Sequence, residues 1–129
     1  MGYRKDVREV IEGLDLLVLP SLYEGLPLVA AEAQAMGKPV IATNVDGNPE
    51  VVINNKTGLV IPLRSPQALK EAIKVFLNNR ELGVQMGKEG RKHVEANFNI
   101  KKQITQTQRL YGELCGIHSF RASHIGYRV

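Results

Sequence analysis

The sequence is poor in the residues that mark several large classes of protein. It has a single cysteine, Cys115, no tryptophan and only 5% aromatic residues. One cysteine excludes an internal disulfide framework and favours a reducing compartment, so we expect a cytoplasmic protein. Few aromatic rings leave little material for stacking on single-stranded nucleic acid. No run approaches the roughly 18 to 20 apolar residues that cross a bilayer, so we expect no transmembrane segment.

Familiar signatures of metal, nucleotide and nucleophile chemistry are also missing. His93, His118 and His124 have no second His or Cys at ligand spacing, and no Asp-x-Asp pair occurs, which favours ordinary surface histidines over a metal site. Gly37-Lys38 lacks the flanking residues of a P-loop, and there is no Gly-x-Gly-x-x-Gly. Ser21 has no evident His and Asp companions. We therefore expect no metal and no cofactor.

Positive charge is in modest excess and is spread along the chain. The formal net charge is +4 and the pI about 9.3, with Lys and Arg scattered among acidic residues. A nucleic-acid footprint is normally clustered, so we expect no nucleic-acid partner. The same excess suits an anionic small ligand.

The hydrophobic period changes several times along the chain. Between Val7 and Leu14 apolar residues recur every three or four positions, which predicts an amphipathic helix ending at Gly13. The apolar run Leu14–Leu19 then predicts a buried parallel strand, and Pro39–Ala42 and Leu59–Ile61 repeat that pattern.

Helical patterns separate and follow these three strands. They cover residues 27–36, 49–53, 66–77 with Ser65 as N-cap, 80–96 and 100–115. Strands alternating with helices predict right-handed crossovers and a parallel sheet, so the fold class is α/β. We expect one domain over residues 1–115 and a loose tail over 116–129. Three strands make a thin sheet, which suggests part of a larger fold.

The candidate binding region follows the first predicted strand. In open α/β sheets ligands bind beyond the carboxyl ends of the strands. There Gly25 allows close backbone approach, and the amides of the helix that begins near Pro27 face outward at the positive end of its dipole. A diphosphate could dock at such a terminus, although an ordinary loop with a tight turn would look the same.

Glu32 is the second candidate, because its position predicts an unusual environment. It follows Leu28 by four residues and precedes Met36 by four, so we expect it on the apolar face of its helix, with Gln34 toward the other side. Burying an unpaired carboxylate is costly, and two adjacent sugar hydroxyls would satisfy it. A Lys or Arg inside the fold would also satisfy it, and a less buried face would remove the need.

Several stretches together carry a family resemblance. They are Pro20-Ser21-Leu22-Tyr23-Glu24-Gly25-Leu26-Pro27-Leu28, Glu32-Ala33, Gly37-Lys38-Pro39-Val40-Ile41-Ala42-Thr43, Pro49-Glu50-Val51-Val52 and Thr57-Gly58-Leu59-Val60-Ile61-Pro62. With seven residues between Glu24 and Glu32, this pattern closely resembles glycosyltransferase family 4, and the similarity runs from about Asp6 to Phe98. The resemblance implies the second half of the C-terminal domain of a GT-B enzyme, a partial Rossmann-like sheet.

The resemblance also assigns roles to residues. It places Glu24, the catalytic candidate, near the transferred sugar, and Glu32 on the nucleotide ribose. Substrate-binding backbone would come from Gly25, Leu26, Pro27 and Leu28, although Pro27 has no N–H. Asp46 stands where the family usually has Gly, which puts a phosphate role for its turn in doubt and leaves Glu50 as a helix cap. The implied substrate is a nucleotide-diphospho-sugar, transferred with retention and without metal.

Other parts of such an enzyme are not in this sequence. The family has an N-terminal acceptor domain and an upstream Arg and Lys that neutralise the donor diphosphate, so we expect little or no transfer by this chain alone. Any membrane contact would come from the intact protein. The strand Leu16–Leu19 would have a neighbour in the missing half, so its bare edge predicts self-association.

Two other functions stay open. The chain could be a non-catalytic nucleotide-sugar-binding or interaction module. It could also belong to a sugar phosphorylase or a glycogen-synthase-like enzyme, but those carry different residues beside the first glutamate than Gly25-Leu26-Pro27.

Overall fold

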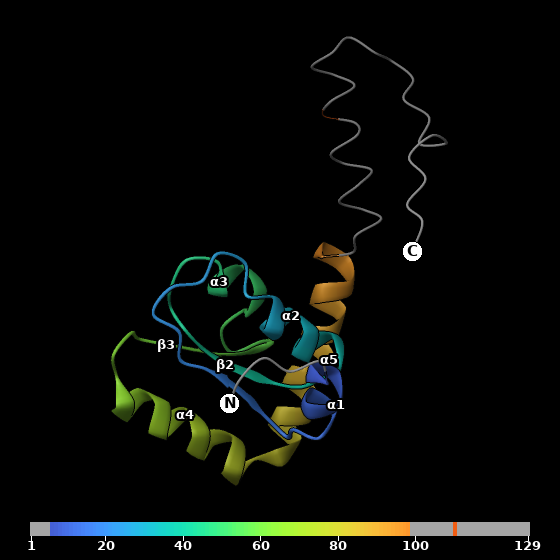
Figure 1. The fold of residues 1–129 in the computed structure, drawn as a ribbon. Helices are drawn as coiled ribbons and strands as arrows, with labels where there is room; N and C mark the ends of the chain where they lie inside the picture. The colour runs from blue at the N-terminus through green and yellow to red at the C-terminus, as the bar shows by residue number, and fades with distance from the viewer. Residues whose placement is uncertain (1–5, 99–109, 111–129) are drawn as a thin grey trace. The chain divides into compact units, whose positions relative to one another are not determined.

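The computed structural model describes residues 6–98 and Leu110, and within them it has an α/β fold (Figure 1). Its elements are α1 Val7–Glu12, β1 Leu17–Leu19, α2 Leu28–Ala35, β2 Val40–Thr43, α3 Asn48–Val51, β3 Gly58–Ile61, α4 Pro66–Asn78 and α5 Arg80–Asn97. Of the described residues, Asp6–Asn97 form one compact unit. The helix predicted over 100–115, apart from Leu110, and the tail predicted over 116–129 lie outside the described residues.

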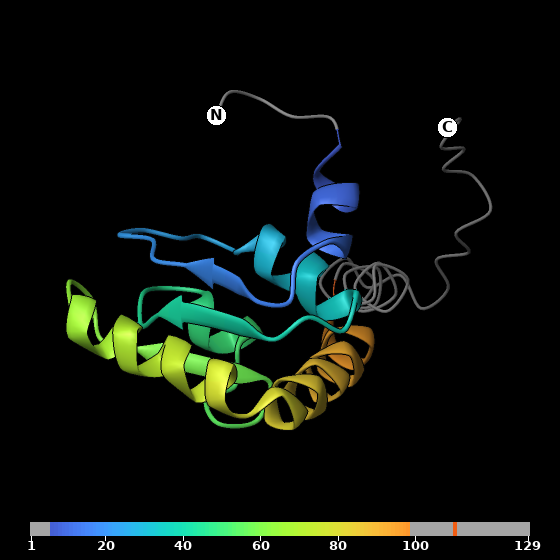
Figure 2. The same cartoon turned by 90° about the horizontal axis from the view of Figure 1, so that it is seen from below.

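The three strands form one parallel sheet in the order β1-β2-β3, as predicted. Leu17 pairs with Val40, which pairs with Gly58, and Figure 2 shows the arrows of β1 and β2 pointing the same way. The carboxyl ends of the strands therefore share one edge. β1 is shorter than the predicted Leu14–Leu19, because the Leu14 amide donates to Ile11 O at 3.1 Å and prolongs the end of α1 instead.

The central strand β2 is buried on both faces, which explains its uninterrupted apolar sequence. On one face Ile41 and Ile61 pack with Ala72 and Phe76 of α4 and Met86 of α5. The opposite-facing side chains of β2, Val40 and Ala42, are fully buried, and α2 contacts this strand. Helices on both faces thus hold the strand ends in place.

Helix α2 lies close against α5 because glycines of α5 face it. A Cβ on Gly87 would stand 1.9 Å from Gly37 O, and a Cβ on Gly90 would stand 3.0 Å from Gln34 Cγ. Gln34 is fully buried, and its Nε2 donates to Thr57 Oγ1 at 2.9 Å. The face of α2 that packs on the fold is therefore the one that carries Gln34.

Local sequence signals correctly predicted where several helices begin or end. Ser65 is the N-cap of α4, and its side chain accepts from the Ala68 amide at 3.3 Å. Gly13 follows α1, and Gly37, with φ +72°, follows the end of α2.

Candidate functional site

Two loops meet at the carboxyl edge of the sheet and bring Glu24 next to the turn that contains Asp46. The Glu24 amide donates to Asp46 Oδ2, and the Gly47 amide donates to Glu24 O, both at 3.3 Å. Gly47 has no room for a side chain, since a Cβ there would lie 2.1 Å from Gly25 O. The loop that follows β1 is therefore seated on the turn that follows β2.

The Glu24 side chain is half-buried and directed by a hydroxyl. Ser21 Oγ donates to Glu24 Oε1 at 2.6 Å. Ser21 is in turn anchored to the end of β2, because Thr43 Oγ1 donates to Ser21 O at 2.6 Å. Hydroxyl donors to carboxylates at this distance are strong, so the carboxylate has a preferred orientation.

The backbone amides predicted to meet a ligand are only partly available. The Leu28 amide donates to Leu26 O at 2.8 Å, and Pro27 has no N–H. Those of Gly25, Leu26 and Val29 donate to no other group among residues 6–98 and 110. Two of the four predicted positions therefore keep a free donor, and Val29, which the sequence did not single out, adds a third at the start of α2.

Glu32 is exposed, so the predicted burial on an apolar helix face is wrong, and Gln34, placed toward the other side, is the buried residue. α2 is rich in alanine, so its sequence hardly distinguishes one face from another, and the contact with α5 selects the buried face. Leu28, one turn before Glu32, is 63% exposed. Glu32 therefore lies on the open side of α2, and within the described residues it has no basic partner.

The loop around Gly25 also carries exposed apolar side chains that the sequence analysis did not single out. Tyr23 is 84% exposed, and Leu22 and Leu26 are 53% and 44% exposed. Large apolar groups exposed together commonly mark a surface that something else covers. The one feature of the sequence that could have pointed to these side chains is their position directly after a predicted strand.

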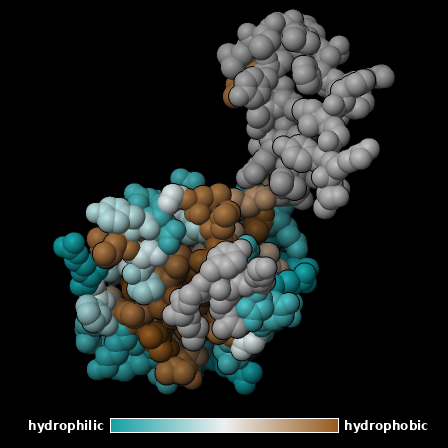
Figure 3. Space-filling view, viewed as in Figure 1, coloured by the Kyte–Doolittle hydropathy of each residue, from teal (hydrophilic) through white to brown (hydrophobic). Residues whose placement is uncertain are grey.

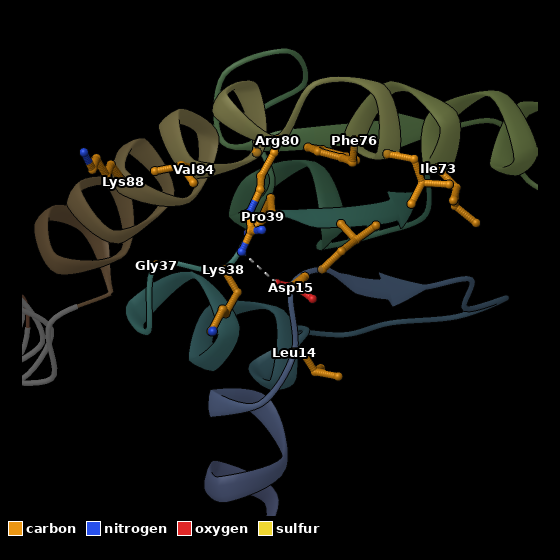
Figure 4. A pocket seen from close by; sticks show the side chains of 13 residues that line it. Leu14, Asp15, Gly37, Lys38, Pro39, Ile73, Phe76, Arg80, Val84 and Lys88 are labelled. Carbon is orange, nitrogen blue, oxygen red and sulfur yellow. Dashed lines mark ion pairs between the residues drawn. The ribbon is translucent and has the colours of Figure 1, made fainter.

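A cavity of about 490 Å³ lies at the opposite edge of the sheet (Figure 4). Its lining includes Leu14–Leu16, which precede β1, and Gly37–Pro39, which precede β2. Arg80 Nη2 reaches Asp15 Oδ1 at 4.0 Å across it, but both side chains are more than 90% exposed, so this ion pair contributes little. The cavity is therefore remote from Glu24 and does not belong to the candidate site.

Among residues 6–98 and 110, no three His, Cys, Asp or Glu side chains stand where they could share a metal ion. In that same part of the chain, no helix has the length and apolar character needed to span a bilayer. His93 Nε2 lies 2.9 Å from Glu50 O, a structural contact between α5 and α3.

Comparison with known proteins identifies the family. Residues 1–93 match the family model described as glycosyl transferases group 1. The chain belongs to this family.

The group 1 domain is similar to longer proteins. It is 34% identical over 86% of its length to the UDP-Gal:alpha-D-GlcNAc-diphosphoundecaprenol alpha-1,3-galactosyltransferase of Escherichia coli, of which it covers 28%. It is 38% identical to the solved sucrose-phosphate synthase of Thermosynechococcus elongatus, with a TM-score of 0.78, over 83% of this chain and 27% of that one.

A third likeness concerns the fold alone. The structure of Anabaena HepE in complex with UDP-glucose has a TM-score of 0.78 and 22% identity, over 90% of this chain and 31% of that one. The group 1 domain thus spans about three tenths or less of these relatives, and its structural neighbours are GT-B glycosyltransferases matched over part of their chains. The predicted α/β GT-B class is confirmed.

Proposed function

We propose that this group 1 domain is the donor-binding half of a retaining glycosyltransferase of family 4. The observation that carries the proposal is Glu24, held by Ser21 at the carboxyl edge of the sheet beside a helix N-terminus. A carboxylate next to unpaired amides suits a ligand that combines hydroxyl groups with a diphosphate. Nucleotide-diphospho-sugars have this chemistry.

The contribution of the domain is orientation and electrostatics. The Gly25, Leu26 and Val29 amides would stabilise the departing diphosphate, and the Glu24 carboxylate would accept from hydroxyls of the transferred sugar. Glu32, on the open side of α2, would accept from the ribose. Asp46 is occupied by the Glu24 amide, so we assign its turn no phosphate contact. Transfer would proceed with retention and without a metal or a cofactor.

In the intact protein we propose an N-terminal acceptor domain and an upstream Arg and Lys that neutralise the diphosphate. The isolated chain would then bind donor weakly and transfer sugar poorly or not at all. We place the intact enzyme in the cytoplasm, in peripheral contact with the membrane. The lengths of the relatives, three to four times the matched region, support the proposal of a further domain.

The first test is calorimetric titration of the chain with UDP-, GDP- and ADP-sugars. We expect the nucleotides of one base to bind. For that base, the nucleotide-sugar should bind more tightly than the free nucleoside diphosphate, because Glu24 contacts only the sugar. Binding to none of them would contradict the proposal. Binding without turnover by the intact protein, supplied with acceptor, would instead support a non-catalytic module.

The edge of β1 predicts self-association of the isolated chain. The Leu17 amide donates to Pro39 O, so the backbone N–H and C=O of Leu17 face β2. In a parallel strand these groups alternate in direction from one residue to the next, so the backbone N–H and C=O of Val18 point away from the sheet. Figure 3 shows apolar atoms crossing the middle of the face turned to the viewer. We propose that a second copy pairs here.

Sedimentation velocity tests this association. We expect a dimer whose fraction rises with protein concentration, and we expect Val18→Pro, which removes the outward N–H, to shift the boundary toward monomer. Clean monomer at high concentration would count against the pairing. Thermal unfolding of the variant, followed in parallel, establishes that its monomer is folded.

A further inference from the structure

The Glu24 backbone and side chain are held by three different partners. The carboxylate accepts from Ser21 Oγ at 2.6 Å, the amide donates to Asp46 Oδ2, and the carbonyl accepts from the Gly47 amide. A loop residue needs none of these contacts merely to remain at the surface. Together the three contacts fix both the backbone and the side-chain orientation of this half-buried residue.

Two hydroxyls connect this carboxylate to the core. Thr43, the last residue of β2, is 4% exposed, and its Oγ1 donates to Ser21 O at 2.6 Å. The Thr43 carbonyl accepts from Asn48 Nδ2 at 2.8 Å, and Asn48 is fully buried. Thr43 is therefore fixed on both sides, and through Ser21 it fixes the direction of Glu24.

We propose that Ser21 is a positioning residue that aims Glu24 at the transferred sugar, with Thr43 as its support in the core; this rests on the proposed function of Glu24. Ser21 occupies Oε1, and Oε2 accepts no hydrogen bond among residues 6–98 and 110, so Oε2 is the oxygen left for a sugar hydroxyl. A side chain ordered before binding loses less entropy when the ligand arrives.

The measured quantity is the sugar increment, defined as the Kd of the free nucleoside diphosphate divided by the Kd of its sugar form. It is obtained with the pairs UDP and UDP-glucose, GDP and GDP-mannose, and ADP and ADP-glucose. Ser21→Ala should reduce the increment by about three- to tenfold and leave the Kd of the free diphosphate unchanged. Ser21→Thr keeps the hydroxyl and should retain most of the increment.

A double-mutant cycle separates positioning from general loss of structure. If Ser21 acts only through Glu24, Ser21→Ala should have no further effect on the increment in a Glu24→Gln background. Thr43→Val, which keeps the shape and removes the hydroxyl, should reproduce a part of the Ser21→Ala effect, and Thr43→Ser should not. Equal losses in the two backgrounds would overturn the positioning role.

Failure of this inference and failure of the proposed function give different results. A wild-type chain without a sugar increment for any pair, or a Glu24→Gln chain that keeps it, would overturn the role of Glu24 and the positioning role with it. A Glu24→Gln chain that loses the increment while Ser21→Ala keeps it would overturn the positioning role alone.

Discussion

Gly87→Ala is expected to destabilise the group 1 domain by about 2 kcal/mol, because overpacking in a packed interior costs up to about 3 kcal/mol and the higher helix propensity of alanine returns about 1 kcal/mol. The added Cβ would stand 1.9 Å from Gly37 O and 2.7 Å from Gly37 C. Both atoms are backbone, so no rotamer change can relieve the overlap, and α2 must move away from α5. Urea denaturation at equilibrium, followed by far-UV circular dichroism, measures the loss.

Gly83→Ala is the matched control in the same helix. Its Cβ would lie 3.3 Å from Phe76 Cδ1, the side-chain atom nearest to it, and a ring can shift where a carbonyl cannot. Alanine is also the better helix former by about 1 kcal/mol. We expect Gly83→Ala to remain within about 1 kcal/mol of the wild type. Equal effects of the two substitutions would show that close approach at Gly87 does not hold α2 in place.

The order of helices and strands could be predicted from sequence because its signals are local. Ser65 caps α4 and Gly13 follows α1 through contacts within one turn of chain. The start of β1 is different, because it depends on where Pro39 O meets the Leu17 amide. Pairing depends on the neighbouring strand and not on the apolar run alone. The strand predicted from that run, Leu14–Leu19, was therefore too long.

The orientation of α2 could not be predicted for a related reason. Its alanines make nearly every face apolar, and the choice is made by Gly87 and Gly90, which are distant in sequence. Gln34 therefore entered the core, where Thr57 bonds it, and Glu32 faced outward. A buried polar side chain with a partner across the fold has no local signature.

The place of the candidate residues in the fold could be predicted from sequence, but their contacts could not. Glu24 and Gly25 follow a buried strand and precede a helix, and this order alone places them at the carboxyl edge. The bonds from Ser21 and to Asp46 depend on how two loops meet, and residue types do not reveal them. The sequence offered reason only to reject Ser21 as a nucleophile, and did not reveal that its hydroxyl donates to Glu24.

Glu32→Ala is expected to weaken binding of the nucleotide-sugar by about 1.5 to 3 kcal/mol, the range for hydrogen bonds to a charged group. This corresponds to about ten- to hundredfold in Kd. Because Glu32 contacts the ribose in our proposal, binding of the free nucleoside diphosphate should weaken by the same factor. Glu24→Gln should instead affect only the sugar form, so calorimetry with both ligands distinguishes the two carboxylates.

The exposure of Glu32 makes this test cleaner than a buried glutamate would. Removing an exposed carboxylate from a helix leaves no cavity and no unpaired partner, so the free energy of unfolding should stay within about 0.5 kcal/mol of the wild type. Glu81→Ala, at an exposed position in the first turn of α5, is the matched control and should leave donor affinity unchanged. A Glu32→Ala chain that binds donor as tightly as the wild type would exclude the ribose contact. Because the substitution leaves the stability of the fold unchanged, a change in donor affinity can be assigned to the lost contact.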